Sequence, residues 1–243
     1  MTDLPLAHRH TPGASPTIVF LAGYRSDMQG SKVLALEAWA QARGQGFLRF
    51  DYAGCGESPG DFEDQTLASW RDDALRMIDT VVEGPVVLVG SSMGGWLMLL
   101  VAKARPERVI GMVGIAAAPD FTRWGFTEAE KQTLAEQGRL EQPSDYGPEP
   151  MVTTLPFWTS GEANLVLESP IDFAGPVRLL QGQQDAEVPW ELALRLAATL
   201  RSEKVQTWIV KDGNHRLSRD GDIRLLLRAT EDVLIECSSP SSC

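Results

Sequence analysis

The chain has 243 residues, of which 43% are hydrophobic and 23% are charged, a composition that is ordinary for a soluble globular protein. A chain of this length buries a large core without help from disulfides or metals. The 22 Lys and Arg residues against 33 Asp and Glu residues give a formal net charge of −11, which argues against nucleic acid or an anionic membrane as the main partner.

Short apolar runs alternate with segments of helical periodicity over most of the chain. In chain order we expect a strand at 17–21, a helix at 31–43, a strand at 47–51, a helix at 66–82, a strand at 85–90, a helix at 96–104 and a strand at 109–115. After a less regular stretch the alternation resumes with a strand at 177–181, a helix at 190–200, a strand at 205–210 and a helix at 223–235. Strands separated by helix-length connections predict an α/β fold, a mostly parallel sheet with helices on both faces.

In the less regular stretch, prolines, glycines and charged residues interrupt short helical pieces. We interpret residues 1–118 and 169–237 as one α/β core and residues 119–168 as a cap, or lid, inserted into it. The serine-rich residues 238–243 are expected to form a flexible tail. In parallel sheets ligands bind at the carboxyl ends of the strands, so we expect the functional residues there.

The pattern Gly-x-Ser-x-Gly occurs twice, at residues 56–60 and at residues 90–94. This pattern is typical of a sharp strand-to-helix turn that lifts a nucleophilic serine clear of the backbone. Such a turn needs a strand before the serine and a helix after it. The residue after the serine must also offer its backbone N–H to a developing oxyanion.

Ser92 meets these requirements and Ser58 does not. Ser58 is followed by Pro59, which has no N–H, and it lies in a glycine-rich loop with no helix directly behind it. Ser92 follows an expected strand, Met93 supplies an N–H, and a helix follows. Ser91 is the nearest rival but lies one position outside the glycine frame. The alternative interpretation of Ser92 is a tight β–α turn with a bystander serine.

A serine hydroxyl is a weak nucleophile unless a base takes its proton. The chain has three histidines, and two of them, His8 and His10, precede the first clear strand, where they suit a surface or edge-strand position. His215 lies in the loop directly after the expected strand at 205–210. It is therefore the candidate general base for Ser92.

The acid that orients His215 is expected in the loop after the preceding strand, where Asp185 stands. It would accept a hydrogen bond from the distal ring nitrogen, fixing the tautomer and stabilising the imidazolium. Glu187 is the second candidate, and Asp212 is close to His215 in sequence, which makes it a poor one. The alternative role of Asp185 is to cap the helix that begins near Pro189.

The second oxyanion donor is expected from the loop after the first strand. Gly23 permits a tight turn there, and we assign the backbone N–H of Tyr24 as the partner of the Met93 N–H in the oxyanion hole. The neighbouring Arg25 is either a carboxylate-binding residue or a solvated surface charge.

Five segments carry a resemblance to the α/β-hydrolase superfamily. They are Phe20–Tyr24, Arg49–Ser58, Val89–Leu97, Gly182–Trp190 and Asp212–Leu217. Within the superfamily, the chain resembles bacterial relatives of the mammalian mitochondrial abhydrolase-domain-containing protein ten. The resemblance spans about residues 17–227 and places the family's nucleophile, acid and base on Ser92, Asp185 and His215.

That family is associated with palmitoyl-protein thioesterase and acyl-glucuronide esterase activity. The resemblance therefore implies hydrolysis of carboxylic esters or thioesters, acyl-protein and acyl-CoA-like thioesters included, without a cofactor. The chain departs from much of the superfamily in having Ala22 where a histidine often precedes the glycine, which removes one side chain that supports the oxyanion loop.

Two other classes of function stay open beside the hydrolase. A lyase or an acyltransferase can use the same three residues, and a non-catalytic binding protein can retain a hydrolase fold. Enzymes of this fold with an aspartate nucleophile are disfavoured by the serine at position 92.

The cap is expected to determine the substrate. It carries aromatic and other apolar side chains that suit an acyl pocket, and the alternative is that they only pack the cap onto the core. The pocket candidates are Phe121, Trp124, Phe157 and Trp158, with Phe126, Tyr146 and Met151 nearby in sequence.

The remaining expectations concern cofactors and location. The three cysteines, Cys55, Cys237 and Cys243, lack the spacing of zinc ligands and suit a reducing compartment. We expect no metal, no cofactor, no nucleic-acid partner and no membrane span. The expected partner is a small-molecule or acylated-protein ester or thioester.

The N-terminus matches neither a secretory signal nor a mitochondrial leader, so the cytoplasm is the expected location. Cys55 is expected near the site but not as its nucleophile.

Overall fold

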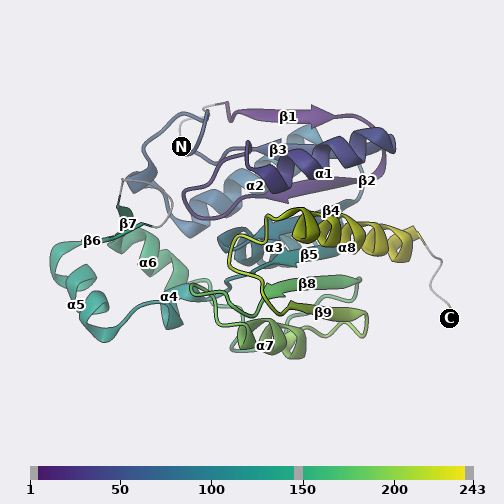
Figure 1. The fold of residues 1–243 in the computed structure, drawn as a ribbon. Helices are drawn as coiled ribbons and strands as arrows, with labels where there is room; N and C mark the ends of the chain where they lie inside the picture. The colour runs from purple at the N-terminus through teal and green to yellow at the C-terminus, as the bar shows by residue number, and fades with distance from the viewer. Residues whose placement is uncertain (1–4, 145–149, 239–243) are drawn as a thin grey trace.

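The computed structural model describes residues 5–144 and 150–238. Within them, seven strands form one sheet in the order β1-β3-β2-β4-β5-β8-β9 (Figure 1). Their bounds are β1 His8–Thr11, β2 Ala14–Leu21, β3 Gln45–Phe50, β4 Val86–Ser91, β5 Val109–Ile115, β8 Val177–Gly182 and β9 Val205–Val210. Strand β1 is antiparallel to β3, and the other neighbouring pairs are parallel. The predicted mostly parallel sheet is confirmed.

Helices cover both faces of this sheet. They are α1 Ser31–Ala42, α2 Leu67–Val81, α3 Met93–Ala104, α7 Glu191–Thr199 and α8 Asp220–Ser238, and a short 3-10 helix, η1, spans Phe62–Asp64. Helix α1 packs beside α8, and α2 packs beside α3. The two pairs lie on opposite faces of β5, because a Cβ at Gly111 would meet Val233 of α8 and one at Gly114 would meet Met98 of α3. Figure 1 shows α1 and α8 in front of the sheet.

The apolar runs of the sequence become buried strands for a simple reason. All six residues of β4 are buried between two helical layers, so both faces of the strand must be apolar or small. The same burial makes β4 a rigid support for the turn that follows it at Ser92.

Two ends of the chain differ from expectation. Strand β1 was not predicted, because its residues are polar and exposed, as an edge strand permits, and carry no apolar alternation. At the other end α8 continues to Ser238, which therefore belongs to the helix and not to the expected tail. The rest of that tail, residues 239–243, lies outside the described residues.

Residues 119–168, the expected cap, contain short elements of their own. They are α4 Phe121–Trp124, α5 Glu128–Gln137, β6 Arg139–Gln142, β7 Met151–Thr154 and α6 Leu155–Glu162. Strands β6 and β7 pair with each other as a two-stranded sheet, and Thr127 with Glu130 forms a capping box at the start of α5. Figure 1 shows this segment beyond the carboxyl ends of the parallel strands.

Asp120 holds the two ends of this segment together. It is buried in a left-handed conformation with φ 58°, and its carboxylate accepts hydrogen bonds from the backbone N–H groups of Val166 and Leu167 at 2.8 Å each. The segment thus leaves the core and returns to it at one point.

Candidate active site

Ser92 lies at the turn between β4 and α3. Its backbone has φ 54° and ψ −120°, a strained conformation for a residue with a side chain. The glycines around it are required by close packing, because a Cβ at Gly90 would overlap the Gly94 carbonyl and a Cβ at Gly94 would overlap the Leu21 carbonyl. The glycine frame found in the sequence therefore reflects a real steric demand.

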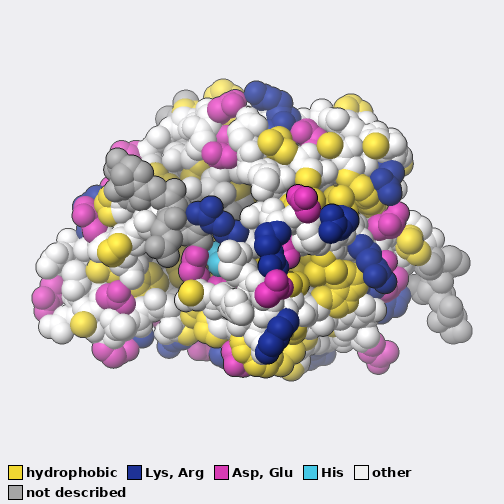
Figure 2. All heavy atoms as spheres, in the orientation of Figure 1, with side chains coloured by type: hydrophobic (Ala, Val, Ile, Leu, Met, Phe, Trp, Pro, Cys, Tyr) yellow, Lys and Arg dark blue, Asp and Glu magenta, His cyan; other side chains and the backbone are white. Residues whose placement is uncertain are grey.

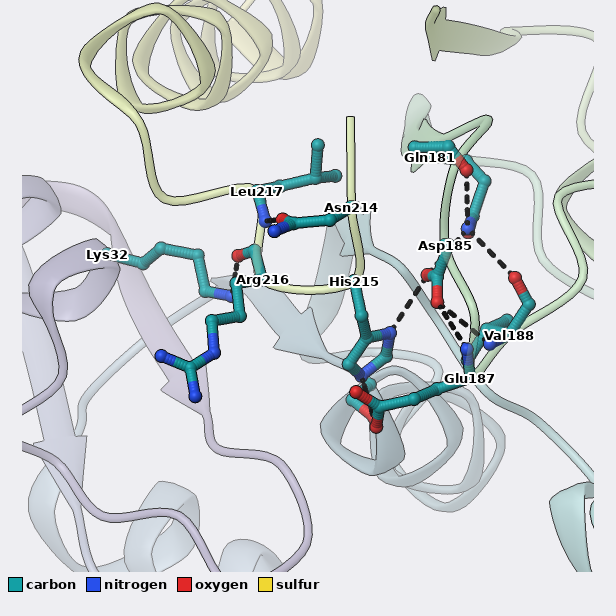
Figure 3. Close-up of polar contacts among 11 residues, drawn as sticks. Lys32, Gln181, Asp185, Glu187, Val188, Asn214, His215, Arg216 and Leu217 are labelled. Carbon is teal, nitrogen blue, oxygen red and sulfur yellow. Dashed lines mark hydrogen bonds and ion pairs between the residues drawn. The ribbon is translucent and has the colours of Figure 1, made fainter. Parts of the chain in front are cut away.

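His215 connects Ser92 to Asp185, and Figure 3 shows its ring turned toward the Asp185 carboxylate. Its Nε2 lies 3.1 Å from the Ser92 hydroxyl, and its Nδ1 lies 2.9 Å from Oδ2 of Asp185. The three residues come from loops after β4, β8 and β9, so the parallel sheet brings them together at its carboxyl edge. The His215 side chain is 13% exposed and that of Asp185 is fully buried.

The Asp185 carboxylate is surrounded by hydrogen-bond donors. Oδ1 accepts the backbone N–H groups of Glu187 and Val188 at 2.9 Å, while Oδ2 accepts the Gln181 amide at 2.9 Å as well as His215. Burial by itself would raise the pKa of Asp185, but the hydrogen bond and charge of His215, with the backbone bonds, outweigh it and lower that pKa. The carboxylate is therefore ionised and fixed in orientation.

Gln181 was missed by the sequence analysis. It is the buried last-but-one residue of β8, and its amide also donates to the Gly182 and Val188 carbonyls at 3.3 Å. The available signal was a glutamine directly after two leucines near the end of the expected strand, four residues before Asp185.

The rival acids lie elsewhere. Glu187 approaches His215 at Nε2, the nitrogen that faces Ser92, at 3.7 Å, and its side chain is 46% exposed. Asp212 pairs with Arg219 at 2.7 Å on the surface. Neither carboxylate contacts Nδ1 in the way that Asp185 does.

The second Gly-x-Ser-x-Gly segment has a structural role. The Ser58 hydroxyl donates to the Asp51 carbonyl at 2.6 Å and accepts the Ala7 N–H at 2.9 Å, which joins the loop to the N-terminal segment. In the same loop Cys55 is buried, and burial raises the pKa of its thiol to about 12. A thiol held protonated in this way is a poor nucleophile.

A comparison with known proteins now identifies the fold family. Residues 18–237 match the family model described as "Alpha/beta hydrolase family". The chain belongs to this family.

Specific relatives share most of the chain. It is 40% identical over 243 residues to the mouse protein named palmitoyl-protein thioesterase ABHD10, mitochondrial, covering 98% of this chain and 82% of that protein. A solved structure of the mouse alpha/beta hydrolase domain-containing protein 10 superposes with a TM-score of 0.91 at 38% identity, covering 98% of this chain and 97% of the other. A structure from Agrobacterium vitis S4 gives a TM-score of 0.91 at 39% identity, covering 96% and 95%.

The residues expected to supply the two oxyanion donors, Met93 and Tyr24, line the same cavity as Ser92. Met93 is the first residue of α3, so its N–H belongs to the helix N-terminus. The loop after β2 passes close, since a Cβ at Gly23 would lie 3.4 Å from the Ser92 Cβ. The Tyr24 side chain turns away from this loop, and its hydroxyl donates to the Val152 carbonyl of β7 at 2.6 Å.

A cavity of about 360 Å³ adjoins Ser92 and His215 on the side of the 119–168 segment. Of the four pocket candidates, Phe121 and Trp124 line it, and so do Phe126 and Met151. Its other apolar lining residues include Met93, Ala118 and Val188. Polar side chains line it too, namely Gln142, Ser144, Thr153 and Glu187. The hydrolase therefore has a cavity next to the serine hydroxyl whose wall is mainly aromatic and aliphatic, and we call it the apolar cavity.

Two of the pocket predictions were wrong. Phe157 is 1% exposed and packs its ring against Tyr24, Trp70 and Phe121 in the core instead of lining the cavity. Trp158 donates from Nε1 to the Thr122 carbonyl at 3.1 Å and is also absent from the cavity lining. Phe157 and Trp158 both belong to α6, whereas Phe121 and Trp124 belong to α4, so an apolar residue type alone did not separate the element that lines the cavity from the one that packs behind it. Tyr146 lies outside the described residues.

Residues 5–144 and 150–238 contain neither a metal-ligand cluster nor a helix of membrane-spanning character. There is no group of three or more His, Cys, Asp or Glu side chains arranged to hold a metal ion in these ranges. None of the helices there has the length and apolar character that crossing a membrane requires.

Proposed function

We propose that this α/β hydrolase cleaves carboxylic esters or thioesters through an acyl-enzyme formed on Ser92. The observation that carries the proposal is the hydrogen-bonded series Asp185–His215–Ser92, with Ser92 held in a strained turn at the carboxyl edge of the sheet. Family membership supports hydrolysis in general, and the geometry supports this particular set of residues.

In the acylation step His215 Nε2 takes the Ser92 proton as Oγ attacks the substrate carbonyl. The backbone N–H groups of Met93 and Tyr24 are assigned to the oxyanion, and Asp185 stabilises the imidazolium. The tetrahedral intermediate collapses as the C–O or C–S bond breaks and His215 protonates the leaving group. In the deacylation step His215 takes a proton from a water molecule as its oxygen attacks the acyl-enzyme. The bond to Ser92 Oγ then breaks, His215 returns the proton to Oγ, and the carboxylic acid is released.

The acyl chain is assigned to the apolar cavity beside Phe121 and Trp124. The mouse relative's name, palmitoyl-protein thioesterase, supports thioesters among the substrates, acyl-proteins included. The cytoplasmic location stays a prediction, since the word mitochondrial describes that relative.

The test combines labelling with turnover. A fluorophosphonate probe is expected to label the wild-type protein and not the Ser92→Ala variant, and a panel of acyl thioesters and p-nitrophenyl esters is expected to be hydrolysed. An unlabelled wild-type protein would support the non-catalytic alternative. Labelling with transfer of the acyl group to an added alcohol in preference to water would support an acyltransferase.

A further inference from the structure

A second cavity, of about 350 Å³, opens on another side of Ser92 and His215. It shares Tyr24, Met151 and Glu187 with the apolar cavity and is otherwise bounded by the loop after β2, the start of α1 and the loop that carries His215. Figure 3 shows Lys32 and Arg216 on one side of His215, with Asp185 and Val188 on the other. The two cavities therefore meet at the serine hydroxyl.

The linings of the two cavities differ in charge. Arg25, Lys32 and Arg216 line the second cavity, against the acidic Asp27 and Glu187. Among the described residues that line the apolar cavity there is no Lys or Arg. In a chain of net charge −11, an excess of cations beside the reactive serine points to a negatively charged ligand. Figure 2 shows several Lys and Arg side chains near the centre of this face.

Lys32 and Arg216 are brought together by a direct contact. Lys32 reaches from the first turn of α1, and its Nζ donates to the Arg216 carbonyl at 2.5 Å. That acceptor is uncharged, so the bond positions the ammonium group without neutralising it. Burial and then the nearby Arg216 charge lower the pKa of Lys32 to about 8. An anion placed between these two side chains would offset both effects.

Arg25 has a more constrained position. Its guanidinium donates to the Pro150 carbonyl and lies over the Phe62 ring at 5.2 Å. Glu187, with its carboxylate 3.7 Å from His215 Nε2, keeps the region next to the serine unfavourable for an anion. The favourable place for a negative charge is therefore the end of the cavity formed by Lys32 and Arg216.

We propose that this second cavity receives the leaving group, and that Lys32 and Arg216 bind a carboxylate or phosphate carried by it. The inference rests on the proposed function and adds the orientation of the substrate: the apolar cavity takes the acyl chain, and the charged cavity takes the released alcohol or thiol. The C–O or C–S bond that breaks then lies where the two cavities meet, next to Ser92.

The experiment compares three butanoyl thioesters that differ only in the leaving thiol: 3-mercaptopropionate, its neutral amide, and 2-mercaptoethyl phosphate. Each kcat/KM is divided by the rate of alkaline hydrolysis of the same thioester. We expect the wild-type protein to prefer the anionic thiols over the amide by about fivefold or more, as for one or two partly exposed charge contacts. The two anionic substrates distinguish carboxylate from phosphate.

Variants assign the preference to these side chains. Lys32→Gln and Arg216→Gln are each expected to reduce the anionic-to-neutral ratio about threefold to fivefold, and Lys32→Arg is expected to preserve it. Lys103→Gln is the matched control, because Lys103 lies in the last turn of α3 and lines other cavities. A ratio that falls as much in the control would overturn the assignment.

The pH dependence of the ratio gives a second readout. Lys32 faces Arg216, which lowers its pKa, and Asp222 and Asp185, which raise it. The ratio is expected to fall as the pH rises through about 8 in the wild-type protein and to stay level in Lys32→Arg. A pH effect on the chemical step itself changes kcat/KM for the anionic and the neutral substrate alike and cancels in the ratio.

The inference and the proposed function fail in different ways. Equal normalised rates on all three thioesters would refute the charged leaving-group site and leave the hydrolase in place. Absence of hydrolysis and of fluorophosphonate labelling would refute the function. In that case, NMR titration with 3-mercaptopropionate and its amide still tests whether the second cavity binds an anion. Tighter binding of the carboxylate that Lys32→Gln abolishes would support the inference. Equal or weaker binding of the carboxylate would overturn it.

Discussion

The strand ends that carry Ser92 and Asp185 are fixed by the buried main chain of the sheet, whereas residues 119–168 are attached to the core largely through side chains, such as Phe157 packed against Tyr24 and Trp70. Every residue of β4 is buried, and so is every residue of β8. The Asp120 carboxylate joins the two ends of the 119–168 segment to each other, and the Tyr24 hydroxyl of the core donates to the Val152 carbonyl of the segment. Its strands β6 and β7 pair only with each other among the described residues.

This difference separates two tasks. The reacting side chains need fixed geometry, which a parallel sheet with closely packed glycine turns provides. The walls of the apolar cavity need only an apolar surface of suitable shape, which short helices such as α4 provide. Substitutions at the strand ends should therefore change rate, and substitutions in the 119–168 segment should change substrate preference.

The largest effect is expected for Ser92→Ala. Removal of the nucleophile of such a triad lowers kcat by about 10⁶. The melting temperature should change little, because among the described residues the hydroxyl makes its hydrogen bond to His215, which is only half-buried. Ser58→Ala is the matched control: it should retain most activity but lower the free energy of unfolding by about 1–2 kcal/mol, since it loses two buried hydrogen bonds. The reverse pattern in activity assays and thermal melts would reassign the nucleophile.

Asp185→Asn is expected to lower kcat by about 10⁴, because the amide favours the wrong tautomer of His215. Glu187→Gln and Asp212→Asn should have much smaller effects, since neither side chain contacts Nδ1. The measurement is kcat of all three variants on one activated ester, with circular dichroism to verify folding. If Glu187→Gln were the most damaged variant and Asp185→Asn retained full activity, our assignment of the acid would be wrong.

A pair of tryptophans tests the 119–168 segment. Trp124 lines the apolar cavity and Trp158 does not, although both indoles donate to backbone carbonyls of the same segment. Trp124→Ala is expected to reduce kcat/KM for an octanoyl ester relative to an acetyl ester by about tenfold, as the loss of roughly two buried methylene contacts implies. Trp158→Ala should leave this ratio unchanged. Equal changes in both variants would mean that the segment acts through its fold alone.

The smallest effect concerns stability and pH. The pKa of Asp185 is lowered in the folded protein. Its carboxylate therefore stabilises the fold at pH values above its unfolded-state pKa of about 4, and this stabilisation is lost as the pH falls toward the folded-state pKa. The difference in unfolding free energy between the wild-type protein and Asp185→Asn should therefore shrink below about pH 4. Urea titrations at a series of pH values measure it, and a difference that grows on acidification would contradict a lowered pKa for Asp185.

The sequence by itself was sufficient for the residues that local backbone chemistry and chain order constrain. Ser92 could be separated from Ser58 because Pro59 lacks an N–H and because only one of the two serines stands between a strand and a helix. The order of Asp185 and His215 along the chain, each after a strand, was enough to bring them to one edge of a parallel sheet.

The tertiary structure decided which side chains from separate elements meet. Nothing in the polar segment His8–Thr11 distinguishes an edge strand from a loop until β3 pairs with it. The burial of Phe157, the donation from Gln181 to Asp185 and the contact between Lys32 and the Arg216 carbonyl all depend on packing between separate parts of the chain. Periodicity reports which face of an element is apolar, but the direction of one side chain is set by the neighbours that surround it.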